Sequence, residues 1–183
     1  MIEIHPLLEV NEAVLRGIIT GYVSREKYRV IYISTPQDTT FNLQLVNLAS
    51  PYVKQFNTTQ EDIRHSQEAL QAGWSIGAFD GEEPVAIAIA EPQWWNHTLW
   101  IWEFHVAESQ RGKGIGMQLM DRLAERAAPA GLRAMLVETQ TTNVPAIRFY
   151  HKAGFAIEGI DISYYTNEDY PEGEMAIFMK RRL

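Results

Sequence analysis

The sequence predicts an α/β (α+β) fold in which a mixed, mostly antiparallel sheet is flanked by helices. Three strand-like runs follow one another between residues 74 and 106, with short turns between them. After residue 106, strand-like and helix-like runs alternate. A meander followed by a crossover helix and a further strand is typical of a mixed sheet with helices packed on it.

Length and composition favour one globular domain. The chain has 183 residues, of which 46% are hydrophobic and 21% are charged. These values are ordinary for a soluble domain with a sizeable core. We expect a single domain over 1–183, with a less distinctive N-terminal part at 1–73 and a core at 74–180 that carries the motifs.

The N-terminal part predicts two helices and two strands. Apolar residues recur at helical spacing over 9–22, and residues 28–34 and 41–48 are β-branched, aromatic or alternating. Thr58 followed by Glu61 is typical of a capping box, and it predicts a helix over 59–72 that ends at Gly73.

The sequence of residues 74–180 predicts the remaining helices and strands. Residues 74–79 and 85–91 flank an Asp80-Gly81 turn, which is a hairpin signal, and 99–106 forms the third strand of the meander. The later runs predict helices over 115–128 and 144–153 and strands over 132–139, 155–165 and 174–179.

Charge and cysteine content exclude several classes of function. The net charge of −7 disfavours non-specific nucleic-acid binding and mildly favours a cationic substrate. The chain has no cysteine, so it has no disulfide, no thiolate nucleophile and no thiolate metal site. The five histidines show no ligand spacing, and we expect no metal site. There is no secretory signal and no membrane-length apolar run, so we expect a cytoplasmic protein without a membrane partner.

A glycine-rich turn joins the strand at 99–106 to the helix at 115–128. It comprises Arg111, Gly112, Lys113, Gly114, Ile115 and Gly116. It matches neither the dinucleotide fingerprint nor the Walker A loop. A turn of this kind exposes backbone N–H groups at the positive end of a helix, and it therefore predicts a phosphate or pyrophosphate site.

A second group of polar and aromatic residues opens the next helix. Asn143 is placed to cap that helix, and Ala146 and Tyr150 lie four residues apart on one of its faces. The helix ends at Gly154-Phe155.

Together these segments resemble the GNAT superfamily of acetyl-CoA-dependent N-acetyltransferases. The resemblance lies in 111–116, in Glu138-Thr-Gln-Thr-Thr-Asn143, in Ala146-Ile-Arg-Phe-Tyr150 and in Gly154-Phe155. It covers roughly residues 74–180. Within the superfamily, residues 137–151 and the tail near Tyr164-Tyr165 are most similar to streptothricin acetyltransferases.

The resemblance implies roles for individual residues. It implies a sheet whose central strands splay around acetyl-CoA, a co-substrate whose pyrophosphate would bind the amides of 111–116. Val106 would pair through its backbone with the pantetheine arm and polarise the thioester carbonyl. Asn143 and Ala146 would also bind the coenzyme, and Tyr150 would act as general acid near the sulfur.

Three residues are candidates for the base that deprotonates the attacking amine. Glu103 is the first, because it interrupts an apolar strand where a carboxylate binds a proton more readily than in water. Glu138 is the second, because ribosomal-protein N-terminal acetyltransferases resemble this chain in carrying a glutamate there. His105 is the third, since alternation places it on one strand face with Glu103 and Ile101.

Two further groups of residues have either a structural or a ligand-binding interpretation. Trp94, Trp95, Trp100 and Trp102 predict an aromatic cluster that either fills the core or walls the acceptor pocket. The tail 161–174 combines carboxylates with three tyrosines, and it is either a solvated loop or a cation-binding lip.

The expected activity is transfer of acetyl from acetyl-CoA to a primary amine of a small cationic acceptor by direct attack. A streptothricin-like antibiotic is the leading candidate acceptor. A protein N-terminal or lysine acetyltransferase is the alternative enzyme, and a non-catalytic acyl-CoA sensor is the alternative of another class. The family resemblance also allows a homodimer.

Overall fold

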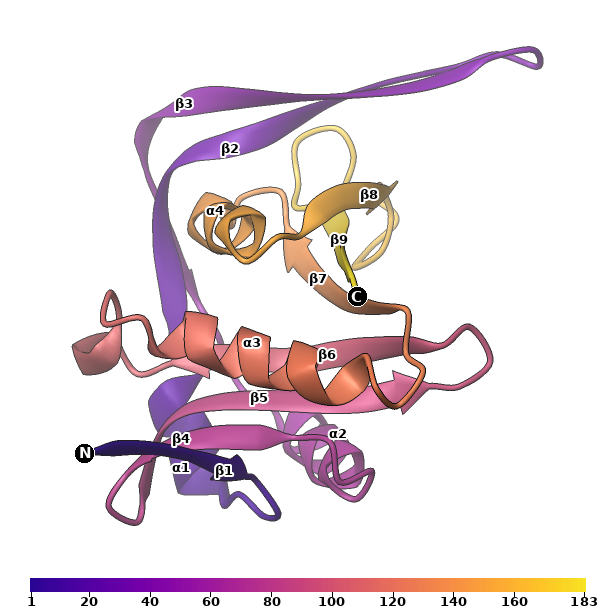
Figure 1. Cartoon of the computed structure of the whole chain (residues 1–183). Helices are drawn as coiled ribbons and strands as arrows, with labels where there is room; N and C mark the ends of the chain where they lie inside the picture. Colours follow the sequence, from indigo (N-terminus) through magenta and orange to yellow (C-terminus); the bar gives the residue numbers. More distant parts are fainter. The chain divides into compact units, whose positions relative to one another are not determined.

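The computed structural model describes residues 1–183, which divide into two compact units. The first unit comprises residues 1–20, 56–137 and 180–183, and the second comprises 21–55 and 138–179. The strand β7 (Ala134–Gln140) passes from the first unit into the second after Val137. Figure 1 shows the elements of both units in chain order by colour.

The first unit is built on a mostly antiparallel sheet, as predicted. Its strands are β1 (Ile2–Pro6), β4 (Ile76–Asp80), β5 (Glu83–Gln93), β6 (Thr98–Val106) and the start of β7, hydrogen-bonded in the order β1-β4-β5-β6-β7. All neighbours are antiparallel except β6 and β7, which are parallel. The crossover from β6 to β7 runs through the short 3₁₀ helix η1 (Glu108–Gln110) and the helix α3 (Ile115–Ala127).

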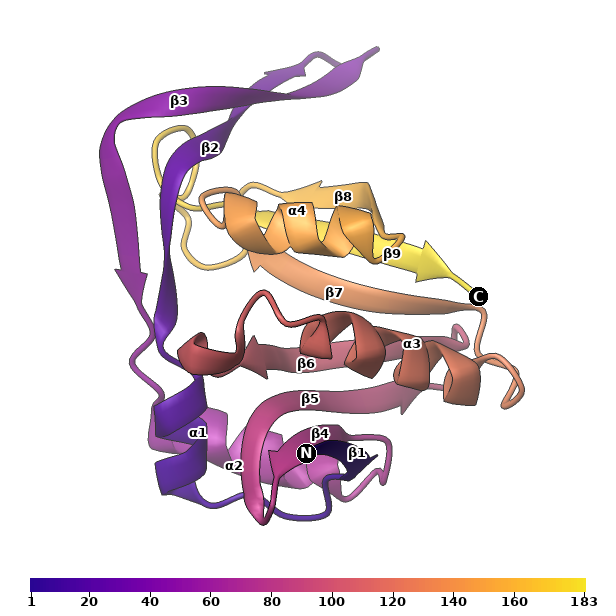
Figure 2. The same ribbon diagram turned by 60° about the vertical axis from the view of Figure 1, so that its left-hand side comes forward.

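Helices cover both faces of this sheet. α1 (Glu12–Ile18) and α2 (Gln60–Leu70) lie on one face and α3 lies on the other, as Figure 2 shows. Alternation along β5 produces this arrangement, because Ile87 and Ile89 point to one face while Ala88 points to the opposite one.

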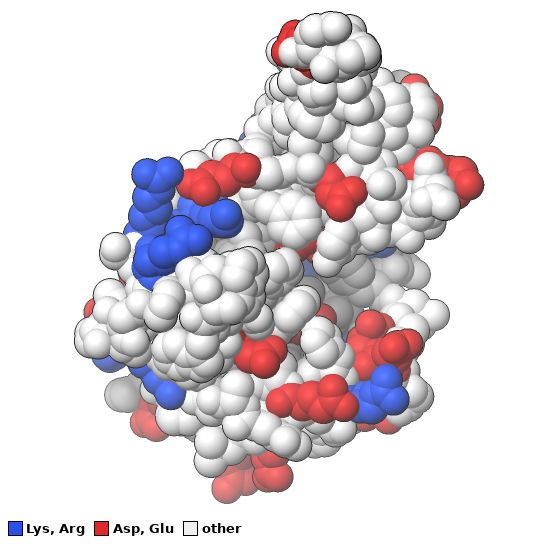
Figure 3. All heavy atoms as spheres, turned by 90° about the vertical axis from the view of Figure 1, so that its right-hand side faces the viewer, with Lys and Arg blue, Asp and Glu red and all other residues white.

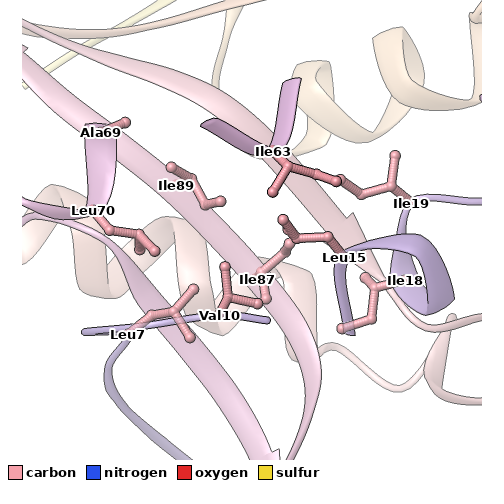
Figure 4. Close-up of a cluster of buried hydrophobic side chains, with 10 residues drawn as sticks. All are labelled: Leu7, Val10, Leu15, Ile18, Ile19, Ile63, Ala69, Leu70, Ile87 and Ile89. Atoms are coloured by element: carbon pink, nitrogen blue, oxygen red, sulfur yellow. The ribbon is translucent and has the colours of Figure 1, made fainter. Parts of the chain in front are cut away.

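The apolar face beneath α1 and α2 is a continuous hydrophobic core. Figure 4 shows Leu15, Ile63, Ile87 and Ile89 pointing toward one another from α1, α2 and β5. Leu15, Ile87 and Ile89 are fully buried. Burial of each such side chain contributes about 1.5–3 kcal/mol to the free energy of folding. This packing holds α1 and α2 against β5, the neighbour of β6.

The start of α2 differs by one residue from the prediction. The cap is Thr59, whose side chain accepts from the Asp62 N–H while the Asp62 carboxylate accepts from the Thr59 N–H. Thr58 is buried, and Glu61 lies outside the box. The capping-box spacing was correct, but Asp62 in place of Glu61 satisfies it.

The second unit combines a long two-stranded ribbon with a small sheet and one helix. β2 (Gly21–Ser34) and β3 (Thr39–Gln55) pair antiparallel along their length. The end of β7, β9 (Ala176–Arg182) and β8 (Ala156–Asp161) form neighbouring strands in the order β7-β9-β8. α4 (Val144–Lys152) contacts β2.

Most predicted elements are confirmed within a few residues, and the larger differences lie near the N-terminus and after β8. The helix predicted over 9–22 covers only Glu12–Ile18, and the strand predicted over 155–165 ends at Asp161. β1 was not predicted, and β2 and β3 are considerably longer than the expected strands at 28–34 and 41–48. Both ribbon strands carry polar residues and break their alternation at a bulge between Ser24 and Glu26. Such strands give a weak periodic signal.

No helix of this structure combines the length and apolarity that crossing a bilayer requires. Acidic side chains recur over the face drawn in Figure 3, in keeping with 23 Asp and Glu against 16 Lys and Arg.

Candidate active site

The last residues of β6 are paired with a neighbouring strand on one side only. The parallel ladder between β6 and β7 runs from Thr98–Ala134 to Ile101–Val137 and stops there, whereas β6 continues to Val106. The pairing of these two strands therefore ends at Ile101–Val137, as the predicted divergence requires. The last residues of β6 keep β5 as a neighbour but have no ladder with β7.

The backbone of Val106 points to this open side. The Ala107 N–H donates to the Val85 carbonyl at 2.8 Å, so this pair is a hydrogen-bonded pair of the β5–β6 ladder. The next pair, Val106–Ala86, is then of the kind whose N–H and C=O groups point away from each other. The Val106 carbonyl accepts from Arg111 Nε at 3.0 Å, which links the strand end to the glycine turn.

The glycine turn has the backbone geometry that a phosphate needs. Gly112 and Gly114 have φ angles of 77° and 82°, and a Cβ placed on either would meet no atom within 4 Å. Gly114 is the N-cap of α3 and supplies no side-chain hydrogen bond to the helix. The space beside Gly112 and Gly114 is therefore open next to the positive N-terminal end of α3, an arrangement that fits a pyrophosphate.

A β-bulge in β6 determines which side chains share a face. Glu103 lies opposite Ile89 and Ile101 lies opposite Ala90, so Trp102 is the extra residue. The bulge puts Glu103 on the Ile89 face, toward α1 and α2, and leaves Ile101 on the other face. The prediction that Glu103 and His105 share a face with Ile101 was therefore wrong about Ile101, because the extra residue reverses the alternation.

Glu103 and His105 form a hydrogen-bonded pair on that face. Their Oε2 and Nε2 atoms are 2.7 Å apart, and the two side chains are 28% and 18% exposed. The His105 ring packs edge-on against Phe56. The first and third candidate bases are thus directly hydrogen-bonded to each other.

The predicted tryptophan cluster divides into two groups. Trp100 and Trp102 stack with ring centroids 4.7 Å apart, and the Trp102 indole donates to Glu91. Trp94 instead packs against Trp74, and Trp95 is 82% exposed. Only the pair on β6 lies on the same face as Glu103.

The second unit holds the other predicted residues. Asn143 caps α4, since its Oδ1 accepts from the Ala146 N–H at 3.2 Å, which confirms the predicted cap. Tyr150 lies about two turns after Asn143 on α4; it is 7% exposed and packs against Phe149 and Phe155. Asn143 and Tyr150 are therefore held by a capped and well-packed helix.

Glu138, near the end of β7, has a tyrosine partner that the sequence did not predict. The Tyr165 hydroxyl donates to Glu138 Oε1 and accepts from Gln140 Nε2. Gln140 and Glu138 are two residues apart on one strand face, and that spacing was visible in the sequence. Tyr165 comes from the loop after β8, and no local pattern links it to β7.

Glu174, from the same loop, binds the ribbon base, by which we mean the start of β2 and the end of β3 around Tyr22, Tyr52 and Lys54. The sequence analysis assigned Glu174 no individual role. Glu174 accepts hydrogen bonds from Tyr22, Tyr52 and Thr142 and pairs with Lys54. Burial acts to raise the pKa of Glu174, but the hydrogen bonds from Lys54 and Thr142 outweigh it and hold this pKa below its ordinary value. Four contacts from distant segments converge here, so no sequence spacing could indicate them.

No three histidine or acidic side chains of the chain are placed to hold a metal ion together. The candidate groups of the first unit are backbone amides, a carboxylate and an imidazole, and those of the second unit are a carboxylate, an amide and phenols.

Comparison with protein families decides the assignment. Residues 42–155 match the model of the acetyltransferase (GNAT) family. The chain belongs to the acetyltransferase (GNAT) family. It is thus an acetyltransferase, and acetyl-CoA is its acyl donor, in agreement with the turn and strand geometry of the first unit.

Several relatives within the GNAT family are similar over most of their length. The streptothricin acetyltransferase of Streptomyces lavendulae is 33% identical over 143 residues, which cover 76% of this chain and 75% of the relative. The streptothricin acetyltransferase of Escherichia coli is 31% identical over 129 residues, or 70% of each chain.

Solved structures agree on the fold. The crystal structure of nourseothricin acetyltransferase aligns with a TM-score of 0.77 over 99% of this chain and 98% of the other, at 23% identity. A Bacillus anthracis structure in complex with acetyl coenzyme A aligns over both chains entirely, with a TM-score of 0.74 at 19% identity. At these identities the alignments establish the GNAT fold.

Proposed function

We propose that this GNAT enzyme transfers acetyl to a primary amine of a small cationic acceptor by direct attack, with a streptothricin-like antibiotic as the leading candidate. The observation that carries the proposal is the similarity to streptothricin acetyltransferases over three quarters of both chains. The acidic net charge of −7 is in keeping with a cationic acceptor.

The reaction assigns a role to each candidate residue. A protonated amine cannot attack a thioester, so Glu103, together with His105, takes the proton from the amine nitrogen. The nitrogen then forms a bond to the thioester carbon, and the Val106 N–H stabilises the oxyanion. When the C–S bond breaks, Tyr150 supplies a proton to the departing thiolate.

Other residues bind the coenzyme and take no part in proton transfer. The amides of 111–116 bind the pyrophosphate, and Asn143 and Ala146 bind the coenzyme arm. Because the chain has no cysteine, the acetyl group passes to the amine without an acyl-cysteine intermediate.

Thiol release from acetyl-CoA tests the activity directly. The panel consists of streptothricin, aminoglycosides, polyamines and short peptides, so it separates a small-molecule enzyme from a protein acetyltransferase. Streptothricin should give the highest kcat/KM. Turnover only with peptides would favour the protein N-terminal or lysine alternative. Tight coenzyme binding in calorimetry with no turnover on any amine would favour the sensor alternative.

A substitution at Glu103 tests the base. Glu103→Gln keeps the shape and a hydrogen bond to His105 but removes the proton acceptor. We expect kcat to fall by roughly 100-fold or more at neutral pH, with acetyl-CoA affinity unchanged. Glu91→Gln, which changes a carboxylate on the same sheet face, is the matched control and should retain turnover. If Glu103→Gln has a normal kcat, Glu103 is not the base, and Glu138 or a water molecule must deprotonate the amine.

A further inference from the structure

The segment between Lys152 and Lys180, in the second unit, carries carboxylates without compensating basic residues. No lysine or arginine occurs between Lys152 and Lys180, whereas six acidic residues do: Glu158, Asp161, Glu168, Asp169, Glu172 and Glu174. This segment supplies Tyr165, the partner of Glu138.

Most of these carboxylates have roles within the fold. Asp169 accepts from the backbone N–H groups of Tyr165 and Thr166 and from the Thr166 hydroxyl, so it closes the loop. Glu172 lies near Lys27, and Glu174 organises the ribbon base. Asp161 accepts from the Ser163 N–H.

Glu138 has a different setting, because two exposed aromatic rings lie beside it. Tyr164 and Tyr165 pack edge to face with centroids 5.2 Å apart, yet they remain 44% and 38% exposed. Burial of the hydroxyl groups and the nearby Glu138 carboxylate raise the pKa of both tyrosines, so both hydroxyls stay neutral and Tyr165 remains a donor.

Gln140 adds an unsatisfied acceptor to this group. Its Nε2 donates to the Tyr165 hydroxyl at 3.2 Å, but its Oε1 is buried and has no hydrogen-bond partner. A buried carbonyl oxygen without a donor is unfavourable by about 1–3 kcal/mol, so this amide would gain from an N–H donor.

We propose that Glu138, Gln140, Tyr164 and Tyr165 form a subsite for an ammonium group of the acceptor other than the one that is acetylated. A carboxylate, an amide oxygen and exposed phenol rings are the groups that bind an alkylammonium ion. The inference rests on the proposed function and adds to it that the acceptor carries at least two amino groups.

This assignment distinguishes Glu138 from a general base. The Tyr165 O–H donates to the Glu138 carboxylate, and this charge-assisted hydrogen bond holds Glu138 in place as a counter-charge for a bound ammonium ion. Glu138→Gln should therefore affect the binding of diamines and leave the chemical step intact.

The test compares α,ω-diaminoalkanes with n-alkylamines of the same chain length as acceptors. For Glu138→Gln we expect the KM for the best diamine to rise about 10- to 100-fold, while its kcat and the KM for the monoamine stay within about two-fold. Tyr165→Phe should raise the diamine KM in the same selective way. Glu168→Gln removes an equal charge from the same loop and should leave both acceptors unchanged.

Two results would overturn the subsite: an equal rise in KM for diamine and monoamine, or a collapse of kcat for both in Glu138→Gln. If the wild-type enzyme acetylates no amine at all, the proposed function fails separately. The subsite is then decided by calorimetric titration of the protein with the diamines. Binding that is weakened by Glu138→Gln but not by Glu168→Gln supports it, and no binding to the wild type refutes it.

Discussion

At the scale of single residues, each unit holds one candidate carboxylate by a hydrogen bond from a second side chain. Glu103 is held by His105 on the same strand, and Glu138 is held by Tyr165 from a distant loop. The first pair was predictable because residues two apart on a strand share a face. The second was not, because its members are 27 positions apart and belong to different elements.

Tyr150 gives a residue-scale prediction. Tyr150→Phe removes only the hydroxyl from a buried ring, so the packing against Phe149 and Phe155 should persist. If the hydroxyl protonates the thiolate, kcat should fall by roughly 10- to 1,000-fold while the acetyl-CoA dissociation constant changes little. Steady-state kinetics and calorimetry measure the two quantities, and unchanged turnover would remove the assignment.

At the scale of elements, sequence patterns predicted the positions of the later helices and of the three-stranded meander. The capping, glycine and alternation signals are local, and they placed α3, α4 and β4 to β6 within a few residues. They could not give the bulge in β6, because one extra residue follows from pairing with β5 and leaves no mark in β6 itself. The same holds for the lengths of β2 and β3, whose pairing is tertiary.

The two ends of α3 provide a matched test of the phosphate site. Gly114 precedes the helix and Gly131 follows it, with φ angles of 82° and 83°, and a Cβ at either position meets open space. Because a side chain at positive φ is strained, Gly114→Ala and Gly131→Ala should each lower the free energy of unfolding by about 1 kcal/mol. Only Gly114→Ala should weaken acetyl-CoA binding, by about tenfold or more, because its methyl group occupies the approach to the amides.

Denaturant titration measures the stability of both variants, and calorimetry measures coenzyme affinity. Equal affinities in the two variants would show that the turn does not contact the phosphates. Bulkier substitutions such as Gly114→Val would add strain at this backbone angle and so confuse the two effects.

The ribbon base gives a pH-dependent prediction. The pKa of Glu174 is lowered in the folded state from its ordinary value of 4.5, so its contribution to stability is complete above that value and is lost as the pH falls through the lowered folded pKa. Glu174→Gln should reduce the free energy of unfolding by about 1–3 kcal/mol at pH near 7. The difference from the wild type should shrink in progressively more acidic buffers.

Urea titrations of the wild type and Glu174→Gln over this acidic range measure the difference. Glu172→Gln, whose carboxylate is 89% exposed, is the control and should change stability little at any pH. A constant deficit for Glu174→Gln across the whole pH range would contradict the assignment.

At the scale of the whole molecule, the acidic surface predicts an effect of salt on catalysis. A net charge of −7 should attract a cationic acceptor, so kcat/KM for such an acceptor at saturating acetyl-CoA should fall several-fold as salt rises from low to high ionic strength. A hydroxylated monoamine, which carries a single positive charge, should show a smaller change than a diamine. A salt-independent kcat/KM for the cation would mean that electrostatic attraction does not assist binding.

The fold class and the family were accessible from sequence, because backbone turns and helix caps leave local signatures; the coenzyme-binding residues remain a prediction. The two-unit division and the links between Tyr165 and Glu138 and around Glu174 were not, since they join segments far apart in the chain.

The extra residue at Trp102 has a consequence for comparing relatives. It shifts the phase of β6, so a homologue without the insertion would need its carboxylate one position earlier to present it on the same side of the sheet. An alignment that ignores this offset would pair Glu103 with a residue that faces the opposite side of the sheet. It would therefore misjudge which enzymes carry an equivalent carboxylate.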